Sequence, residues 1–195
     1  MRPALFLFFV PLIAVGQPLM AIVGATDSIP YSIFNATGST ALRMGDVASN
    51  KKRAQSFVPA SPAVGTIHVN KVTVSIAKVG APGDNVTAEI WSSTGAPNPS
   101  ALLYSSTTTI VGSTLTTTMT NTDFLFSTVS LNVGTKYWVV IAPSRGSSVD
   151  GTNYYTLASS SANPFAGGGM SAVNVSWTVE SGAVDIVFSV VGVTP

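Results

Sequence analysis

The chain contains no cysteine and a single histidine, His68, among its 195 residues. Without cysteine there is no disulfide framework, no thiol nucleophile and no cysteine-ligated metal. One histidine also excludes a histidine-rich metal site. The lack of cysteine does not argue against export from the cytoplasm, because a domain of this size buries enough core without covalent cross-links.

Charged residues are also scarce. They make up 9% of the chain, whereas about a quarter of the residues in a typical soluble domain are charged. The net charge of +1 offers no clustered basic surface, so we expect no nucleic-acid partner. Hydrophobic residues reach 46%, and much of the remainder is uncharged Ser and Thr, a composition common in exported β proteins. The length corresponds to one domain with or without an appendage.

The N-terminal segment is the longest apolar stretch. Residues 4–25 are almost wholly apolar, and Arg2 is the only charged residue before Asp27. A basic start, an apolar run and small residues at Val23-Gly24-Ala25 form the pattern of a cleaved signal peptide. The same segment is also long enough for a membrane anchor, which needs about 20 apolar residues.

These two interpretations remain open, although Pro11, Gln17 and Pro18 would weaken a spanning helix. The order of the basic, apolar and small-residue regions favours the signal peptide. Our working prediction is nevertheless the retained anchor. Under both, everything after Asp27 lies outside the cytoplasm, in the periplasm or at the cell surface. The expected organisation is a hydrophobic anchor or signal peptide at 1–25, an extended linker at 26–52 and a β-sandwich domain at 53–195.

The clearest strand pattern runs from Lys71 to Trp91. Val72, Val74 and Ile76 alternate with Thr, Ser and Ala, and the same alternation returns at Val86, Ala88 and Ile90. Successive side chains of a strand point to opposite faces, so each segment has one apolar face. The turn-forming residues 80–85 between them predict that the two strands are antiparallel neighbours in a hairpin.

Further strand candidates follow at the short spacing of an all-β domain, and no segment shows a capped helical period. We therefore predict an all-β fold, an antiparallel two-sheet sandwich of the jelly-roll or Greek-key type, preceded by an N-terminal hydrophobic helix. The predicted strands are Ile29–Phe34, Ala54–Val58, Thr66–Lys78, Asn85–Ser92, Leu102–Thr109, Ser113–Thr120, Phe124–Val129, Lys136–Ile141, Asn153–Ala158, Val173–Val179 and Val184–Val193.

An ordered series of these segments resembles a known family. The series comprises Ala54-Gln55-Ser56-Phe57, the strand at 72–78, the run from Asn85 to Trp91, Gly95-Ala96-Pro97 with Leu102-Leu103, and the run from Leu131 to Ile141 that contains Gly134-Thr135-Lys136-Tyr137-Trp138. It is similar, over about residues 53 to 142, to the β-sandwich domain of bacterial "choice-of-anchor" surface proteins. The resemblance implies an extracytoplasmic domain without recognised catalytic residues. Members often carry a C-terminal anchoring segment, whereas this chain ends at Val193-Thr194-Pro195. Any anchor is therefore expected at the N-terminus, and secretion without an anchor stays open.

The residues suited to catalysis are sparse. His68 lies inside a strand pattern, and no nucleophile-elbow sequence accompanies it. Glu89 shares a strand face with Trp91, but no spacing forces a facing pair of carboxylates. The oxygen-rich turns at Asp84 and Asp150 offer too few ligands for a dedicated calcium loop, so turn formation is the favoured interpretation. We expect no enzyme activity, no catalytic residues, no cofactor and no metal site.

The candidates for binding are aromatic or basic. Trp91, Trp177, Phe165 and Met170 are the expected contacts to a protein partner or a glycan, although aromatic residues also dominate sandwich cores. Lys51, Lys52 and Arg53 form the only basic cluster. We favour a solvated loop for it, with contact to anionic lipid head groups as the alternative.

Together these features predict a non-catalytic extracytoplasmic β-sandwich, an accessory or structural subunit of a larger membrane or surface assembly. Its expected partners are other protein subunits, and the membrane through residues 4–25. A secreted or cell-surface carbohydrate-binding module is the alternative. A glycosidase is the least favoured interpretation.

Overall fold

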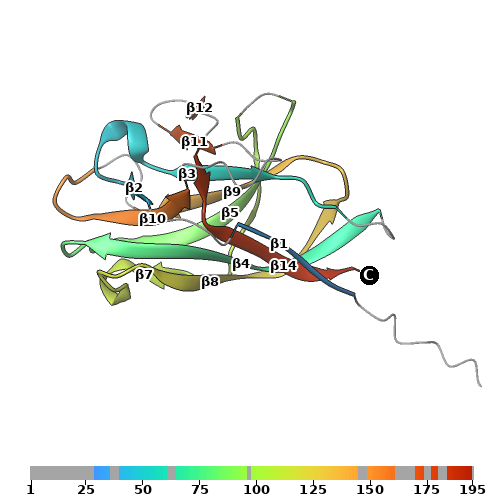
Figure 1. Cartoon of the computed structure of the whole chain (residues 1–195), viewed down its shortest axis with the longest axis horizontal. Coiled ribbons are helices and arrows are strands. Elements are labelled where there is room, and N and C mark those ends of the chain that lie inside the picture. Colours follow the sequence, from blue (N-terminus) through green and yellow to red (C-terminus); the bar gives the residue numbers. More distant parts are fainter. Residues whose placement is uncertain are drawn as a thin grey trace, which may run out of the picture.

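Two antiparallel β-sheets packed face to face make up the described part of the chain (Figure 1). The structure is a computed structural model that describes residues 29–35, 40–60, 65–95, 98–144, 149–160, 170–173, 177–179 and 184–194. The predicted all-β class is confirmed for these residues. Their only helical elements are two short 3-10 turns, η1 (Ala48–Asn50) and η2 (Gly112–Thr114). The predicted N-terminal helix lies outside the described residues, and no helix within them is long and apolar enough to cross a membrane.

The first sheet, sheet A, is built around the long strand β4. One side of β4 pairs with β8, and its other pairing partners are β14 and β10. β14 continues to β1, while β10 also pairs with β2 and β13. The bounds are β1 (Ile29–Asn35), β2 (Thr40–Met44), β4 (Thr66–Val79), β8 (Thr120–Asn132), β10 (Tyr154–Ser160), β13 (Asp185–Ile186) and β14 (Phe188–Thr194).

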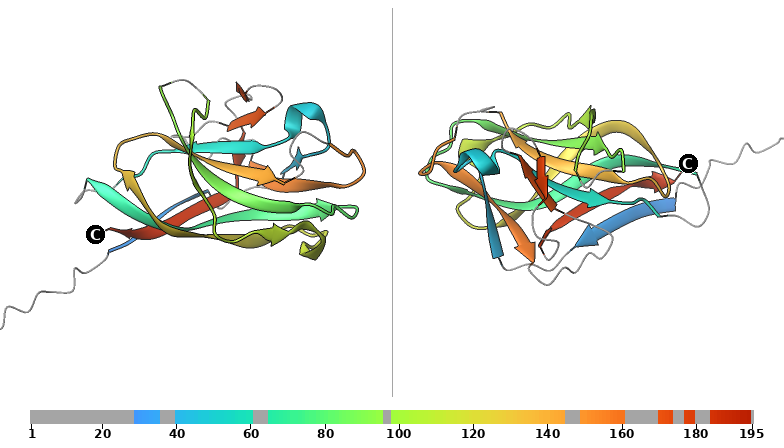
Figure 2. Two further views of the ribbon diagram at one scale, coloured as in Figure 1. Left: turned by 180° about the vertical axis from the view of Figure 1, so that it is seen from behind. Right: turned by 90° about the horizontal axis from the view of Figure 1, so that it is seen from above.

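The second sheet, sheet B, runs in the order β12, β11, β3, β9, β5, β6, with β7 also pairing with β5. Figure 2 shows the two layers from behind and from above. The bounds are β3 (Arg53–Phe57), β5 (Asn85–Ser92), β6 (Leu102–Ser105), β7 (Ile110–Val111), β9 (Tyr137–Pro143), β11 (Met170–Val173) and β12 (Trp177–Val179).

The main core lies between the sheets, and the predicted alternation supplies it. Val72, Val74 and Ile76 of β4 are fully buried, as are Val86, Ala88 and Ile90 of β5, which confirms the apolar face expected for each strand. Every residue of β9 is buried. β9 has apolar residues on both faces and lies between β3 and β5, as expected of a strand that is covered on both sides.

The predicted hairpin between β4 and β5 is wrong. β4 belongs to sheet A and β5 to sheet B, so residues 80–84 carry the chain across from one sheet to the other. An alternating pattern says which side chains are buried, and it is the same whether two strands pair or face each other across a core. The carbonyl of Asp84, the last residue of the crossing, accepts two hydrogen bonds, from the Gly112 amide at 2.9 Å and from the Tyr155 hydroxyl at 2.7 Å.

Several other strand boundaries also differ. No strand forms at 113–119, where hydroxyl groups bond locally instead: Thr114 Oγ1 donates to the Val111 carbonyl at 2.7 Å and Thr116 Oγ1 to the Thr118 carbonyl at 2.6 Å. Such bonds compete with strand pairing in Ser/Thr-rich segments. The strand predicted from Leu102 stops at Ser105, and each of the last two predicted strands is divided in two.

The stretch expected to be a linker contributes to the sandwich. β1 pairs along β14 from Ile29 to Asn35, and β2 pairs with β10 from Thr40 to Met44. The Met44 side chain is fully buried in the main core. Residues 29–44 therefore include two strands of sheet A.

Candidate functional site

The outer face of sheet B carries a second, smaller apolar cluster. Ala54, Trp138 and Val140 are buried there, and Trp91 and Trp177 pack against them while remaining half-buried. The cluster includes all three tryptophans of the chain. β9 brings Trp138 to this face between its neighbours β3 and β5, and in the register it lies directly opposite Trp91. We call Trp91, Trp138 and Trp177 the tryptophan face.

The rings of the tryptophan face contact one another and two ammonium groups. The Trp91 and Trp177 ring centroids are 5.9 Å apart with an interplanar angle of 80°, an edge-to-face arrangement. The Lys52 ammonium lies 5.5 Å from the Trp91 centroid, and the Lys136 ammonium lies 5.7 Å from the Trp138 centroid. Both distances fall in the range of cation–π attraction.

Glu89 links these groups by accepting two bonds on one carboxylate oxygen. The Trp91 indole Nε1 donates to Glu89 Oε2 at 2.8 Å, and Lys52 Nζ lies 3.3 Å from the same oxygen. Glu89 and Trp91 are two residues apart on β5 and therefore share a face, as predicted. The carboxylate thus fixes the Trp91 ring orientation and neutralises the ammonium beside it.

Trp138 sits deeper than the other two rings. It is only 1% exposed, and its indole Nε1 has no hydrogen-bond partner in the part of the chain that the structure describes. A buried donor without a partner costs about 1–3 kcal/mol. The tryptophan face therefore combines charge pairing around Trp91 with one buried donor, Trp138 Nε1, that no described residue satisfies.

The structure brings together two of the aromatic candidates, Trp91 and Trp177, and one residue of the basic cluster, Lys52. Arg53, by contrast, is 4% exposed, and its Nε donates to the Arg43 carbonyl at 2.9 Å. This differs from the expected solvated loop, because β3 begins at Arg53 and includes its side chain in the buried pattern. Lys51 is half-buried directly after η1. Phe165 lies outside the described residues, and of Met170 only the main chain, at the start of β11, is described.

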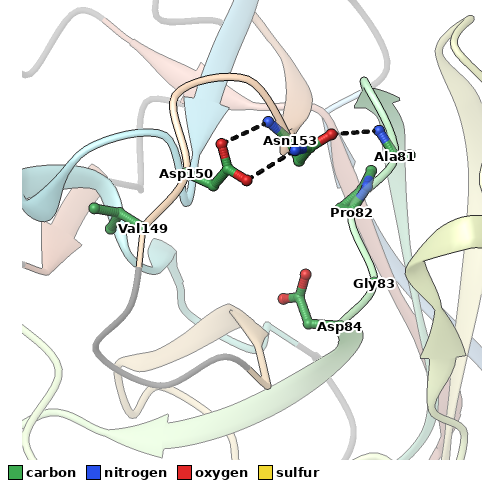
Figure 3. A pocket seen from close by; sticks show the side chains of 7 residues that line it. All are labelled: Ala81, Pro82, Gly83, Asp84, Val149, Asp150 and Asn153. Carbon is green, nitrogen blue, oxygen red and sulfur yellow. Dashed lines mark hydrogen bonds between the residues drawn. The ribbon is translucent and has the colours of Figure 1, made fainter.

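A hollow of about 330 Å³ lies at the end of the sandwich where β4 crosses to β5. Figure 3 shows that it brings the two oxygen-rich turns together, with Asp84 on one side and Asp150 on the other. The Thr152 hydroxyl donates to Asp150 Oδ1 at 2.7 Å and the Asn153 amide to Oδ2 at 2.8 Å. These bonds, the Thr152 hydroxyl first, hold the pKa of the Asp150 carboxyl well below its ordinary value of 3.8. The remaining lining residues are Ala81, Pro82, Gly83 and Val149.

The described carboxylates and His68 lie apart from one another. Among the described residues no group of three or more His, Asp or Glu side chains gathers closely enough to hold a metal ion. His68 lies on β4 between Ser130 of β8 and Val193 of β14 in the register. Asp150 is engaged by its own turn, which agrees with the turn-forming role favoured for that segment.

One edge of sheet B is the apolar surface that sequence reasoning missed. The described residues include seven large hydrophobic side chains that are exposed, and three of them, Leu102, Leu103 and Tyr104, are consecutive on the short edge strand β6. Val111 lies on β7, which pairs with the same strand β5. Leu125 of β8 is tied to the β6–β7 connection, since the Thr107 amide donates to its carbonyl at 2.7 Å. We call Leu102, Leu103, Tyr104, Val111 and Leu125 the β6–β7 edge.

The sequence signal for this edge is a long stretch without charged residues. No charged residue occurs between Glu89 and Asp123, although the chain forms β6 and β7 of sheet B and enters β8 of sheet A within that stretch. Period-two alternation is weak there, because Leu102-Leu103-Tyr104 presents apolar side chains in succession.

A scan against protein-family models finds no match to this chain. A search of the curated proteins also finds no match.

Proposed function

We propose that the chain is a non-catalytic extracytoplasmic β-sandwich, held at a membrane by residues 1–25 and acting as an accessory or structural subunit of a larger protein assembly. The observation that carries this proposal is the β6–β7 edge. Exposed sheet edges pair readily with other chains, and contiguous exposed apolar side chains mark protein–protein contact sites. A subunit covered by its neighbours also has little need of surface charge, which fits the 9% charged content.

The finer features of the proposal rest on the order of the strands and on the sequence. β3, β4 and β5 follow one another in the chain and alternate between sheet B and sheet A. Such crossings support connections of the jelly-roll or Greek-key type, which we propose for this fold. The resemblance of residues 53–142 to the choice-of-anchor β-sandwich supports an extracytoplasmic location, either periplasmic or at the cell surface.

Native gel electrophoresis of the membrane fraction tests the assembly role. The full chain is expected to migrate in a complex much larger than itself, and Tyr104→Lys is expected to shift it to the position of the free chain. Val47→Lys is the matched control, because Val47 is a comparably exposed hydrophobic residue away from the β6–β7 edge. Free migration of the unaltered chain, or an equal effect of both substitutions, would refute the proposal.

A carbohydrate-binding role is the second candidate, and the tryptophan face is the observation in its favour. Half-buried rings beside a carboxylate and an ammonium group can stack on a sugar and bond its hydroxyl groups. The weaker point is that Trp91 already contacts Trp177 and Lys52, so a sugar would have to displace them in part.

Intrinsic fluorescence offers a direct test of this second role, because every tryptophan of the chain lies in the tryptophan face. Titration with soluble polysaccharides should shift or quench the emission if sugars bind there. Trp177→Phe should then weaken binding at least tenfold, about 1.4 kcal/mol, while Tyr104→Phe should leave it unchanged. Emission that stays constant across the polysaccharides removes the carbohydrate-binding candidate.

A further inference from the structure

We infer that the sandwich stands end-on at the membrane, with lipid head groups against one end and the hollow lined by Asp84 and Asp150 at the opposite end. The inference rests on the proposed function, because it takes residues 1–25 to be the anchor and names the surface that faces the bilayer. We call the lipid-facing end the tether end, and it comprises Ile29, Pro59, Asn132–Lys136 and Thr194.

The register of sheet A places the start of β1 at the tether end. Ile29 lies opposite Thr194, at the end of β14, and β14 is antiparallel to β4, so its end lies beside the start of β4. Thr66, the first residue of β4, lies opposite Asn132, the last residue of β8. Figure 1 shows the start of β1 beside the end of β14. The chain therefore enters the sandwich at this end.

The connection from the anchor to the tether end is short. The apolar run ends at Ala25, so only residues 26–28 separate it from Ile29. Even a fully extended chain covers at most about 14 Å over these four steps. The sandwich is much longer, since the strand from Thr66 to Lys78 in β4 spans about 40 Å at about 3.3 Å per residue. The tether end is therefore held close to the bilayer, and the opposite end reaches it only if the sandwich lies on its side.

The distribution of charge favours standing over lying. Asp84 ends the crossing from β4 to β5, and the Asp150 amide donates to the carbonyl of Gly45, the residue before Asp46. These three carboxylates therefore lie at the end away from the anchor. The tether end contains one charged residue, Lys136. Anionic head groups attract lysine and repel carboxylates within about a Debye length, about 8 Å at physiological salt. Standing end-on brings Lys136 toward the lipid and keeps the carboxylates away from it.

The loop of the tether end is fixed to its neighbours by main-chain hydrogen bonds. The Val133 amide donates to the Gly65 carbonyl, just before β4, at 2.9 Å. The Gly134 amide donates to the Pro59 carbonyl, just after β3, also at 2.9 Å. Thr135, the next residue, is exposed. A loop bonded to segments of both sheets meets the head groups with little ordering cost.

Standing end-on also keeps the β6–β7 edge accessible to neighbours in the plane of the membrane. β6 pairs with β5 at Trp91 and β7 pairs with it at Val86, so the edge runs along the length of β5. If the sandwich lay on that side, lipid would cover the same surface. The end-on orientation is therefore the one that agrees with protein association through this edge.

The lack of cysteine allows a single fluorescent label in the full chain, since any introduced thiol is the only one. Thr135→Cys places the label at the tether end. Ser113→Cys is the matched control at the opposite end, where the Lys78 ammonium donates to the Ser113 carbonyl, and both side chains are exposed. The labelled chains are reconstituted in phosphatidylcholine and phosphatidylglycerol vesicles whose head groups carry a nitroxide quencher. The label at 135 should be quenched at least about threefold more than the label at 113, because the two ends are about 40 Å apart.

A second pair of labels keeps the test independent of any one substitution. Asn132→Cys at the tether end and Ala81→Cys at the opposite end are also exposed, and they should reproduce the difference. Equal quenching at the two ends would mean that the sandwich lies on its side, and stronger quenching at 113 would mean that it is inverted. Either result overturns the end-on orientation while the membrane anchor stands. A chain that does not float with the vesicles, with neither label quenched, refutes the anchor itself and the orientation with it.

Discussion

Substituting Gly192 by alanine should destabilise the sandwich strongly, because this glycine allows two strands of sheet A to approach closely. Gly192 lies on β14, between β1 and β4, where the pairing with β4 shifts register after Val191. A Cβ atom at this position would lie 2.1 Å from the His68 carbonyl oxygen and 2.8 Å from the Val69 Cα. Both are main-chain atoms, so no side-chain rotation can relieve the contact.

The cost can be worked out from the displacement that relieves the contact. Reaching an ordinary separation of 3.4 Å from 2.1 Å requires β14 to move by about 1.3 Å. That movement exceeds the tolerance of an N–H···O bond, so about two ladder bonds beside Gly192 would weaken, at about 1 kcal/mol each. Overpacking strain adds about 1–3 kcal/mol, and the reduced freedom of the unfolded chain returns about 0.4–1 kcal/mol. The expected net loss is about 2–5 kcal/mol.

Urea unfolding followed by tryptophan fluorescence measures this loss, and thermal unfolding should show a Tm lower by about 5–15 °C. Gly65→Ala is the matched control, since no atom lies within 4 Å of the Cβ it would carry. It should change the free energy of unfolding by less than about 1 kcal/mol. A Gly192→Ala chain within about 0.5 kcal/mol of the unaltered protein would refute the close-approach argument.

Two further outcomes are expected. Tyr155→Phe should lower the free energy of unfolding by about 1–2 kcal/mol in urea, because the buried hydroxyl bonds the Asp84 carbonyl at 2.7 Å, while Tyr104→Phe, with its ring exposed, should not. The hydrogen bonds of its turn lower the pKa of Asp150. The ionised carboxylate therefore stabilises the fold at pH values above the ordinary pKa of 3.8, and this contribution is lost as the pH falls below it. Acid titration of stability from about pH 5 to pH 2 should therefore be flatter in Asp150→Asn, and identical curves would contradict the assigned hydrogen bonds.

The strands with regular alternation are the part of the fold that the sequence predicts well. The apolar sets of β4 and β5 are buried as expected, and the doubly apolar β9 is central. Alternation reports which face a residue occupies, because the side-chain period of a strand is two. It carries no information about which strand lies alongside, and for that reason the predicted β4–β5 hairpin proved to be a crossing between sheets.

The tryptophan face was predictable only in fragments. Glu89 and Trp91 share a face through simple alternation, but Lys52 reaches them from a segment 37 residues away in the chain. Trp177 arrives from β12. Contacts of this kind depend on strand order, which local patterns do not encode. The β6–β7 edge was missed for the opposite reason, because its signal is an absence of charge rather than a motif.

The two surfaces of sheet B differ in how far their interactions are already satisfied. On the tryptophan face, Glu89 accepts from Trp91 and pairs with Lys52, and Trp177 covers part of the same ring, so a ligand must replace contacts before adding its own. The β6–β7 edge has apolar side chains in water, and no described strand pairs with the outer side of β6, so a partner there has fewer contacts to replace. Binding free energy is the surplus over what the free surface already has. By that criterion the edge, rather than the aromatic cluster, is the surface with the most to gain from a partner, and this is why we place protein association before sugar binding.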